Sequence, residues 1–126
     1  MKNGTIALIA HDGKKDELVE FVLQHQEWFS GFNLVGTGTT GGRIANKGMA
    51  IECLASGPLG GDAQIAARIT EGGVHAVIFF RDPMGKHPHE PDINMLLRQC
   101  DVHNIPLATN LATAQLLVGN KAFERG

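Results

Sequence analysis

Residues 5–12 read Thr-Ile-Ala-Leu-Ile-Ala-His-Asp, an apolar run that ends abruptly in two polar residues. An unbroken apolar run of this length is typical of a strand buried on both faces, as in a parallel sheet. Asp12 is then followed by apolar residues at helical spacing, namely Leu18, Val19, Phe21, Val22 and Leu23. The N-terminal segment therefore predicts a buried strand followed directly by an amphipathic helix.

The same alternation of strand and helix recurs along the rest of the chain. Further strands are expected over 33–35, 49–54, 75–80 and 106–109, and helices over 43–47, 62–71, 91–103 and 112–118. Near-continuous apolar strands indicate that helices cover both faces of the sheet. We therefore predict an α/β fold, a doubly wound and mainly parallel five-stranded sheet flanked by helices, in a single domain spanning 1–126.

Composition excludes several classes of protein. Of 126 residues, 43% are hydrophobic and 19% are charged, which provides enough apolar surface for a folded core. Eleven Lys+Arg against thirteen Asp+Glu give a net charge of -2, so neither nucleic acid nor a membrane surface is an expected partner. No apolar run approaches the ~20 residues of a membrane span. The N-terminus does not resemble a secretory signal, so we expect a cytoplasmic protein.

The two cysteines, Cys53 and Cys100, each lie in an apolar stretch, and no Cys-x-x-Cys pair is present. A metal pair or a disulfide would need a partner at suitable spacing. We expect both to be reduced thiols in the core, as is usual in a reducing compartment.

In a doubly wound sheet, ligands bind outside the carboxyl ends of the strands. The segments that follow the five predicted strands are 11–15, 36–42, 56–62, 81–92 and residue 110. Four of them carry groups that can transfer protons or hold anions. Because parallel strands end at the same edge, these groups are expected to converge there.

The glycine-rich segment 36–42 offers backbone N–H groups, the hydroxyls of Thr37, Thr39 and Thr40, and a helix N-terminus just beyond. Such donors suit a phosphate, although a plain turn of small residues would have the same composition. The order matches neither a Walker A loop nor a dinucleotide-binding loop. Ser56-Gly57 supplies a second set of donors. Lys15, in the first turn of a helix, could serve a bound anion or be an ordinary surface lysine.

Asp62 opens a predicted helix and has two interpretations. It could be the N-cap, or its carboxylate could be a general base that abstracts a proton. His11 could donate a hydrogen bond to a developing oxyanion. The neighbouring Asp12 could be no more than the cap of the first helix. The remaining histidines, His25, His75 and His103, belong to no motif and are expected to be structural or exposed.

Residues 87–92, His-Pro-His-Glu-Pro-Asp, raise a metal hypothesis, since histidines with nearby carboxylates can bind zinc or iron. Two prolines make the segment rigid, and no further pair of ligands stands out, so we expect no metal site. Asp92 could cap the helix that follows, and Asp82-Pro83 predicts a turn.

Taken together, these segments resemble methylglyoxal synthase. The resemblance rests on Ala10-His11-Asp12 with Lys15, and on Thr-Gly-Thr-Thr-Gly at 37–41, Ser-Gly-Pro-Leu-Gly-Gly-Asp at 56–62, Phe-Phe-Arg-Asp-Pro at 79–83, Pro-His-Glu-Pro-Asp at 88–92 and Asn-Ile-Pro-Leu-Ala-Thr-Asn at 104–110. These motifs follow the order of the family and span nearly the whole chain.

The resemblance implies a lyase that converts dihydroxyacetone phosphate to methylglyoxal and inorganic phosphate without metal or organic cofactor. It implies Asp62 as catalytic base and His11 as the group that handles the proton at the enediolate oxygens. It places Lys15, Thr37, Gly38, Thr39, Thr40, Ser56 and Gly57 at the phosphate and His89 at the substrate oxygens. Asp12, Asp82 and Asp92 would be supporting carboxylates. The family forms homohexamers, and phosphate, the product, also inhibits some members.

Three alternatives stay open at this level. The same fold occurs as a non-catalytic effector-binding module, which would lack the combination of His11, Asp62 and Asp92. A metal-dependent hydrolase would use the histidines and carboxylates of 87–92 and would be sensitive to a chelator. A phosphosugar isomerase would release no free phosphate.

Overall fold

The computed structural model describes residues 3–56, 59–85 and 93–120. It contains a five-stranded sheet in the order β3-β2-β1-β4-β5, and all four strand pairings are parallel. The strands are β1 (Thr5–Ala10), β2 (Asn33–Thr37), β3 (Glu52–Leu54), β4 (Ala76–Phe80) and β5 (Leu107–Ala108). The predicted fold class is confirmed.

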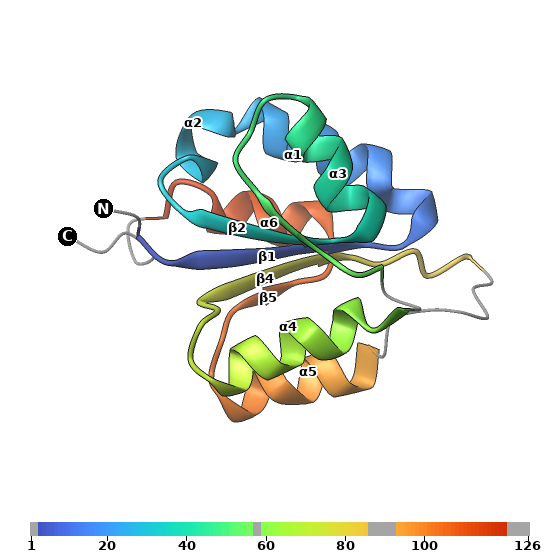
Figure 1. Cartoon of the computed structure of the whole chain (residues 1–126), viewed down its shortest axis with the longest axis vertical. Helices are drawn as coiled ribbons and strands as arrows, with labels where there is room; N and C mark the ends of the chain where they lie inside the picture. Colours follow the sequence, from blue (N-terminus) through green and yellow to red (C-terminus); the bar gives the residue numbers. More distant parts are fainter. Residues whose placement is uncertain (1–2, 57–58, 86–92, 121–126) are drawn as a thin grey trace.

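Helices cover both faces of this sheet, as Figure 1 shows. One face carries α1 (Lys15–Gln24), α2 (Gln26–Phe29), α3 (Gly38–Asn46) and α6 (Leu111–Leu117), and the other carries α4 (Gly61–Thr70) and α5 (Ile93–Val102). A short 3-10 helix, η1 (Asp12–Lys14), precedes α1. Among the helices in the described parts of the chain, none is long and apolar enough to cross a membrane.

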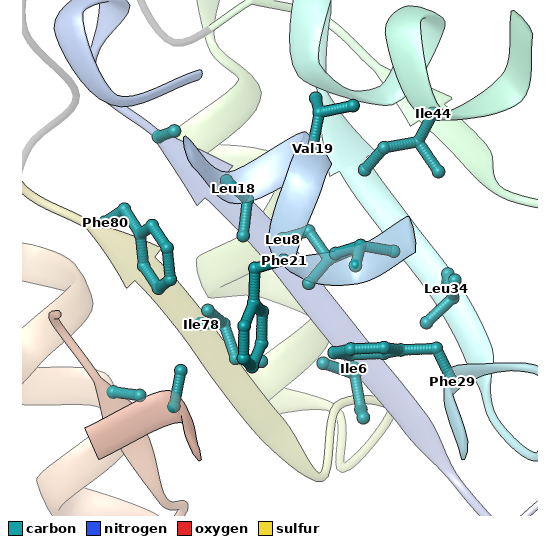
Figure 2. Packing of buried hydrophobic residues seen from close by; sticks show 14 of the residues in the cluster. Ile6, Leu8, Leu18, Val19, Phe21, Phe29, Leu34, Ile44, Ile78 and Phe80 are labelled. Carbon is teal, nitrogen blue, oxygen red and sulfur yellow. The ribbon is translucent and has the colours of Figure 1, made fainter. Parts of the chain in front are cut away.

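The alternation of side chains along β1 builds two cores. Ile6 and Leu8 belong to the core on one face, together with Phe21 of α1 and Phe29 of α2 (Figure 2). Ala7 and Ile9 belong to the core on the opposite face, together with buried residues of α4 and α5. Because β1 lies in the centre of the sheet and is covered on both sides, its residues from Ile6 to Ala10 are all apolar and buried.

The segment 36–42 differs from the expected loop. Gly36 and Thr37 end β2, and α3 already begins at Gly38, five residues before the predicted start at 43. Glycine and threonine have low helix propensity, so the local sequence favours a turn. The helix instead depends on packing: a Cβ added at Gly36 would lie 3.0 Å from Cα of Gly41, which shows how closely α3 approaches β2.

Smaller differences concern strand and helix ends. β3 is limited to Glu52–Leu54, because residues 49–51 do not pair with β2, and β5 is limited to two residues. The short helix α2 was not expected. The other helices agree with the expected ranges to within a few residues, where α5 is described from Ile93 onward.

The two cysteines differ from each other. Cys100 is buried in the core and free, as expected, and burial raises the pKa of its thiol to about 11. Cys53 is free but exposed, so its assignment to the core was wrong. The reason is its place on β3, the edge strand of the sheet, which the apolar context of residues 49–54 did not reveal.

We expect a thiol reagent at about pH 8 to modify one cysteine of the native protein, Cys53, because only the thiolate reacts. With a pKa of about 11, Cys100 is thiolate in only about one molecule in a thousand at that pH. Mass spectrometry after timed alkylation measures this directly. Equal rates of alkylation at the two cysteines would contradict the burial of Cys100. Unfolding the protein with guanidinium should make both cysteines reactive.

Candidate functional site

The sheet order brings four of the predicted segments together. Strands β3, β2, β1 and β4 are consecutive neighbours and run in parallel, so their carboxyl ends lie along one edge. Ser56 follows β3, Thr37 ends β2, His11 follows β1 and Asp82 follows β4. The expected convergence of these loops is therefore present in the structure.

His11 is buried and held in a defined orientation. Its backbone N–H donates to the carbonyl of Phe80 at 3.1 Å, and its ring packs edge-on against Phe79 with centroids 5.1 Å apart. The backbone N–H of Asp82 donates to Nδ1 of the ring at 2.9 Å. Since Nδ1 accepts this bond, the proton of the neutral imidazole lies on Nε2. His11 can thus act as a neutral hydrogen-bond donor.

The N-terminus of α3 has the features of an anion site. Thr37 is its N-cap residue, and the Thr37 side chain makes no capping hydrogen bond. Thr40, in the first turn, is fully buried, and no hydrogen-bond partner of its hydroxyl is found within the described chain. Backbone N–H groups of a first turn and the helix dipole favour a negatively charged ligand.

Gly38 joins this helix to the segment after β3. Its φ of +43° lies in the left-handed region, and a Cβ added there would be 2.8 Å from both Cα and Cβ of Ser56. The backbones of the two segments therefore touch, and only glycine allows that approach. This contact places Ser56 beside the first turn of α3.

Asp62 does not cap α4, so that interpretation was wrong. The N-cap is Gly60, and Asp62 is the second residue of the helix, where its Oδ1 accepts from the N–H of Ala63 at 2.9 Å. The carbonyl of Ser56 accepts from Gly61 at 2.9 Å, which fixes the start of α4 to the end of β3. Asp62 is the next residue after this attachment, and its side chain is half-buried.

Asp12 and Lys15 form an ion pair at the start of α1. Lys15 Nζ lies 2.7 Å from Asp12 Oδ1, so a carboxylate already offsets a lysine in a first turn. Asp12 belongs to η1, and the N-cap of α1 is Lys14, so Asp12 does not cap that helix. The pair leaves the ammonium of Lys15 at the edge of the sheet that carries His11.

The predicted turn at Asp82-Pro83 is present. Asp82 Oδ1 accepts from the N–H of Met84 at 3.1 Å, which closes the turn after β4. The same residue provides the backbone N–H that orients His11. Asp82 therefore contacts the ring of His11 through its backbone and holds its own turn through its side chain.

Several predicted residues lie outside the described chain: Gly57, His89 and Asp92, together with the remainder of the metal hypothesis, His87 and Glu90. Within residues 3–56, 59–85 and 93–120, no group of three or more His, Cys, Asp or Glu could hold a metal ion. Of the histidines outside any motif, His75 is structural as expected, because its Nδ1 accepts a hydrogen bond from the N–H of Thr5 at 2.9 Å.

One residue of the site was missed from the sequence. Gln64 Oε1 accepts from the backbone N–H of Ala55 at 2.9 Å and so ties the first turn of α4 to the end of β3. Its position two residues after Asp62 was the only available signal. A glutamine in a first helical turn is ordinarily solvated, so the sequence gives no reason to select it.

A separate cavity of about 680 Å³ lies at the opposite edge of the sheet, near the start of β2 and β3. Its walls include Phe29, Met49 and an ion pair in which Arg68 donates to Glu52 at 2.8 Å and lowers the pKa of that carboxyl. None of the described residues predicted for the site lines this cavity. It is therefore distinct from the candidate active site.

Comparison with known proteins identifies the family. The family model described as the MGS-like domain matches residues 17–109. Methylglyoxal synthase of Cupriavidus taiwanensis is 55% identical over 122 residues, which are 96% of this chain and 92% of that protein. The chain belongs to the methylglyoxal synthase family.

Two further proteins of the methylglyoxal synthase family support this assignment. Methylglyoxal synthase of Thermus thermophilus is 54% identical over 90% of this chain and 90% of that protein. The crystal structure of methylglyoxal synthase from Elizabethkingia anophelis superposes with a TM-score of 0.93 at 41% identity, over 98% of this chain and 83% of that one. The family recognised from the motifs is confirmed, and with it the assignment as a lyase with a small-molecule substrate.

Proposed function

We propose that this enzyme converts dihydroxyacetone phosphate to methylglyoxal and inorganic phosphate, using the edge of the sheet described above. The proposal rests on two successive contacts that connect the start of α3 to the start of α4. Gly38 touches Ser56, and Ser56 in turn binds Gly61, the residue before Asp62. A phosphate site and a carboxylate base are thereby held a fixed distance apart, as a triose phosphate requires.

The phosphate group is proposed to bind at the N-terminus of α3. The first-turn N–H groups, the hydroxyls of Thr37, Thr39 and Thr40, and the Ser56-Gly57 segment supply donors. Lys15 supplies a positive charge from the neighbouring strand end. Burying the hydroxyl of Thr40 without a partner is unfavourable, so a ligand oxygen that accepts from it would remove that cost.

Asp62 is proposed to take a proton from the hydroxymethyl carbon next to the carbonyl. The electron pair of that C–H bond forms a double bond between the hydroxymethyl carbon and the carbonyl carbon, and negative charge develops on the carbonyl oxygen. His11, with its proton on Nε2, can donate to that oxygen and stabilise the enediolate. Nδ1 of His11 already accepts a hydrogen bond from the N–H of Asp82, so the proton on Nε2 is the one available to the substrate oxygen.

The enediolate then expels phosphate. Cleavage of the C–O bond requires that bond to stand roughly perpendicular to the enediolate plane, so that its electrons overlap with the π system. An isomerase acting on the same substrate must hold the phosphate in that plane. The fixed phosphate site therefore selects elimination over isomerisation. As the C–O bond breaks, its carbon forms a double bond to the former carbonyl carbon, and the hydroxyl of the former hydroxymethyl group loses its proton and becomes the aldehyde. The enolate that remains takes up a proton at the carbon that carried the phosphate and becomes methylglyoxal.

The other carboxylates are assigned supporting roles. Asp12 is proposed to orient Lys15, to which it is paired, and Asp82 to orient His11. His89 and Asp92 are proposed to contact the substrate oxygens and to assist proton transfer, as the family resemblance implies. No metal or organic cofactor enters the proposed reaction.

The test is to supply dihydroxyacetone phosphate and to measure inorganic phosphate and the dicarbonyl product separately. Equal amounts of both are expected, and they should be unaffected by a chelator. Formation of glyceraldehyde 3-phosphate without free phosphate would indicate an isomerase instead. Binding of the substrate analogue phosphoglycolate without any turnover would indicate a non-catalytic module.

Gly38→Ala is expected to weaken inorganic phosphate binding by at least about tenfold, because the new Cβ would force α3 away from Ser56. Competitive inhibition by phosphate measures the affinity. Gly48→Ala is the matched control: Gly48 follows the other end of α3 with a φ of +94°, but a Cβ there meets nothing within 4 Å. Equal losses in both variants would show that backbone strain alone is responsible.

We also propose that the enzyme is a cytoplasmic homo-oligomer, a hexamer by family resemblance. Two free cysteines suit a reducing compartment. Leu59 and Met84, beside the site, and Leu116 on α6 are large apolar side chains that are mostly exposed in the single chain. Multi-angle light scattering would determine the mass, and a monomer at working concentration would contradict the proposal.

A further inference from the structure

The first turn of α4 is attached to the end of β3 at two points on either side of Asp62. Before it, the N–H of Gly61 donates to the carbonyl of Ser56 at 2.9 Å. After it, Oε1 of Gln64 accepts from the N–H of Ala55 at 2.9 Å. Asp62 therefore lies on a turn of helix that is anchored through both of its flanks.

Ala55 is contacted by α4 through both of its backbone polar groups. Gln64 binds its N–H, and a Cβ added at Gly61 would lie 2.0 Å from its carbonyl oxygen. The start of the helix thus approaches the strand end at backbone distance. At that separation, a small rotation of α4 would displace the carboxylate of Asp62 relative to Ser56.

We propose that Gln64 is a positioning residue for the reaction. Its side-chain amide sets the rotation of the first turn of α4, and through it the place of the Asp62 carboxylate relative to the phosphate site. The inference rests on the function proposed above, in which Asp62 is the base. Misplacing a base by a fraction of an ångström reduces the rate even where substrate binding is unchanged.

The chemistry of this contact explains why a glutamine is suited to it. The N–H of Ala55 needs an acceptor, and the amide oxygen provides one without a charge. The hydrogen bond is exposed to solvent, so it contributes little to the stability of the fold. Its loss should therefore appear in the rate of the reaction more than in the melting temperature.

The test is Gln64→Met, which keeps the length of the side chain and removes the acceptor. We expect kcat to fall at least about tenfold, with KM and inhibition by phosphate within about twofold of wild type. Gln64→Glu retains an oxygen acceptor and should recover kcat to within about threefold of wild type. This division between kcat and KM would not result from a general loss of structure.

Gln99→Met is the matched control. Oε1 of Gln99 accepts from the hydroxyl of Thr70 at 3.1 Å, at the other end of α4, and this contact is also exposed. It joins α4 to its neighbour far from Asp62, so kcat should be unchanged. Melting temperatures of the two methionine variants should agree within a few degrees.

The inference is overturned if Gln64→Met has the kcat of wild type, if Gln99→Met loses as much activity, or if Gln64→Glu fails to restore the rate. A loss confined to KM would also overturn it, because Gln64 would then act on binding. Failure of the proposed function is distinguishable from these outcomes, since in that case the wild-type enzyme itself would release no phosphate from dihydroxyacetone phosphate.

Discussion

Asp62→Asn is expected to lower kcat at least ~10²-fold, because general base catalysis typically accounts for 10²–10⁴-fold of the rate. The amide has the shape of the carboxylate but cannot take up the substrate proton. The hydrogen bond that Oδ1 accepts from the N–H of Ala63 can be retained by the amide oxygen, so the helix should be undisturbed. Release of phosphate from dihydroxyacetone phosphate, followed at saturating substrate, measures the effect.

Inhibition by inorganic phosphate should stay within about twofold of wild type in this variant, because the phosphate donors belong to α3 and the Ser56 segment. Asp101→Asn, an exposed aspartate on α5, provides the control for loss of one negative charge and should be fully active. A near-normal rate for Asp62→Asn would exclude Asp62 as the base. A large rise in KM without a change in kcat would assign it to binding instead.

His11→Asn is expected to lower kcat by about 10²–10³-fold, the usual effect of removing one donor to a developing oxyanion. The asparagine oxygen can occupy the place of Nδ1 and still accept from the N–H of Asp82, so the end of β4 keeps its contact. The side chain is too short to donate from the position of Nε2. The variant therefore separates the structural contact of His11 from its proposed chemical role.

His75→Asn is the matched control for this substitution. Nδ1 of His75 accepts from the N–H of Thr5 at 2.9 Å, at the opposite end of β1. Both histidines thus accept a backbone hydrogen bond between neighbouring strands, but only His11 lies at the carboxyl edge. Steady-state kinetics should show loss of kcat in His11→Asn alone. If KM rises and kcat does not fall, His11 binds the substrate without stabilising the enediolate.

The central strand β1 was the most predictable part of the fold. β1 was expected at Thr5–Ala10 and occurs there, because a strand covered on both faces has an unbroken apolar run, here Ile6 to Ala10. Helix α3 was the least predictable. Its first residues, Gly38 to Gly42, have low helix propensity, and its position depends on the close approach of Gly41 to Gly36 in β2.

The candidate site shows the same division. His11, Thr37 and Ser56 could be selected because each lies where a predicted strand ends. The tautomer of His11 could not, because it depends on a backbone N–H from Asp82, which is 71 residues away in the chain. Asp62 was expected to begin its helix, whereas the structure makes Gly60 the N-cap and leaves the carboxylate on the first turn.

The class of fold, the order of its elements and the family could all be inferred from the amino-acid sequence, because patterns of apolar residues and contiguous motifs are local properties of the chain. The contacts between particular atoms became visible only in the folded protein: Gly38 against Ser56, Gln64 with Ala55, and Asp82 with the ring of His11. The first and the last of these contacts join segments that follow different strands, and the contact of Gln64 with Ala55 folds the connection after β3 back onto the strand end. Their geometry is fixed by strand order and helix packing, which no single segment encodes.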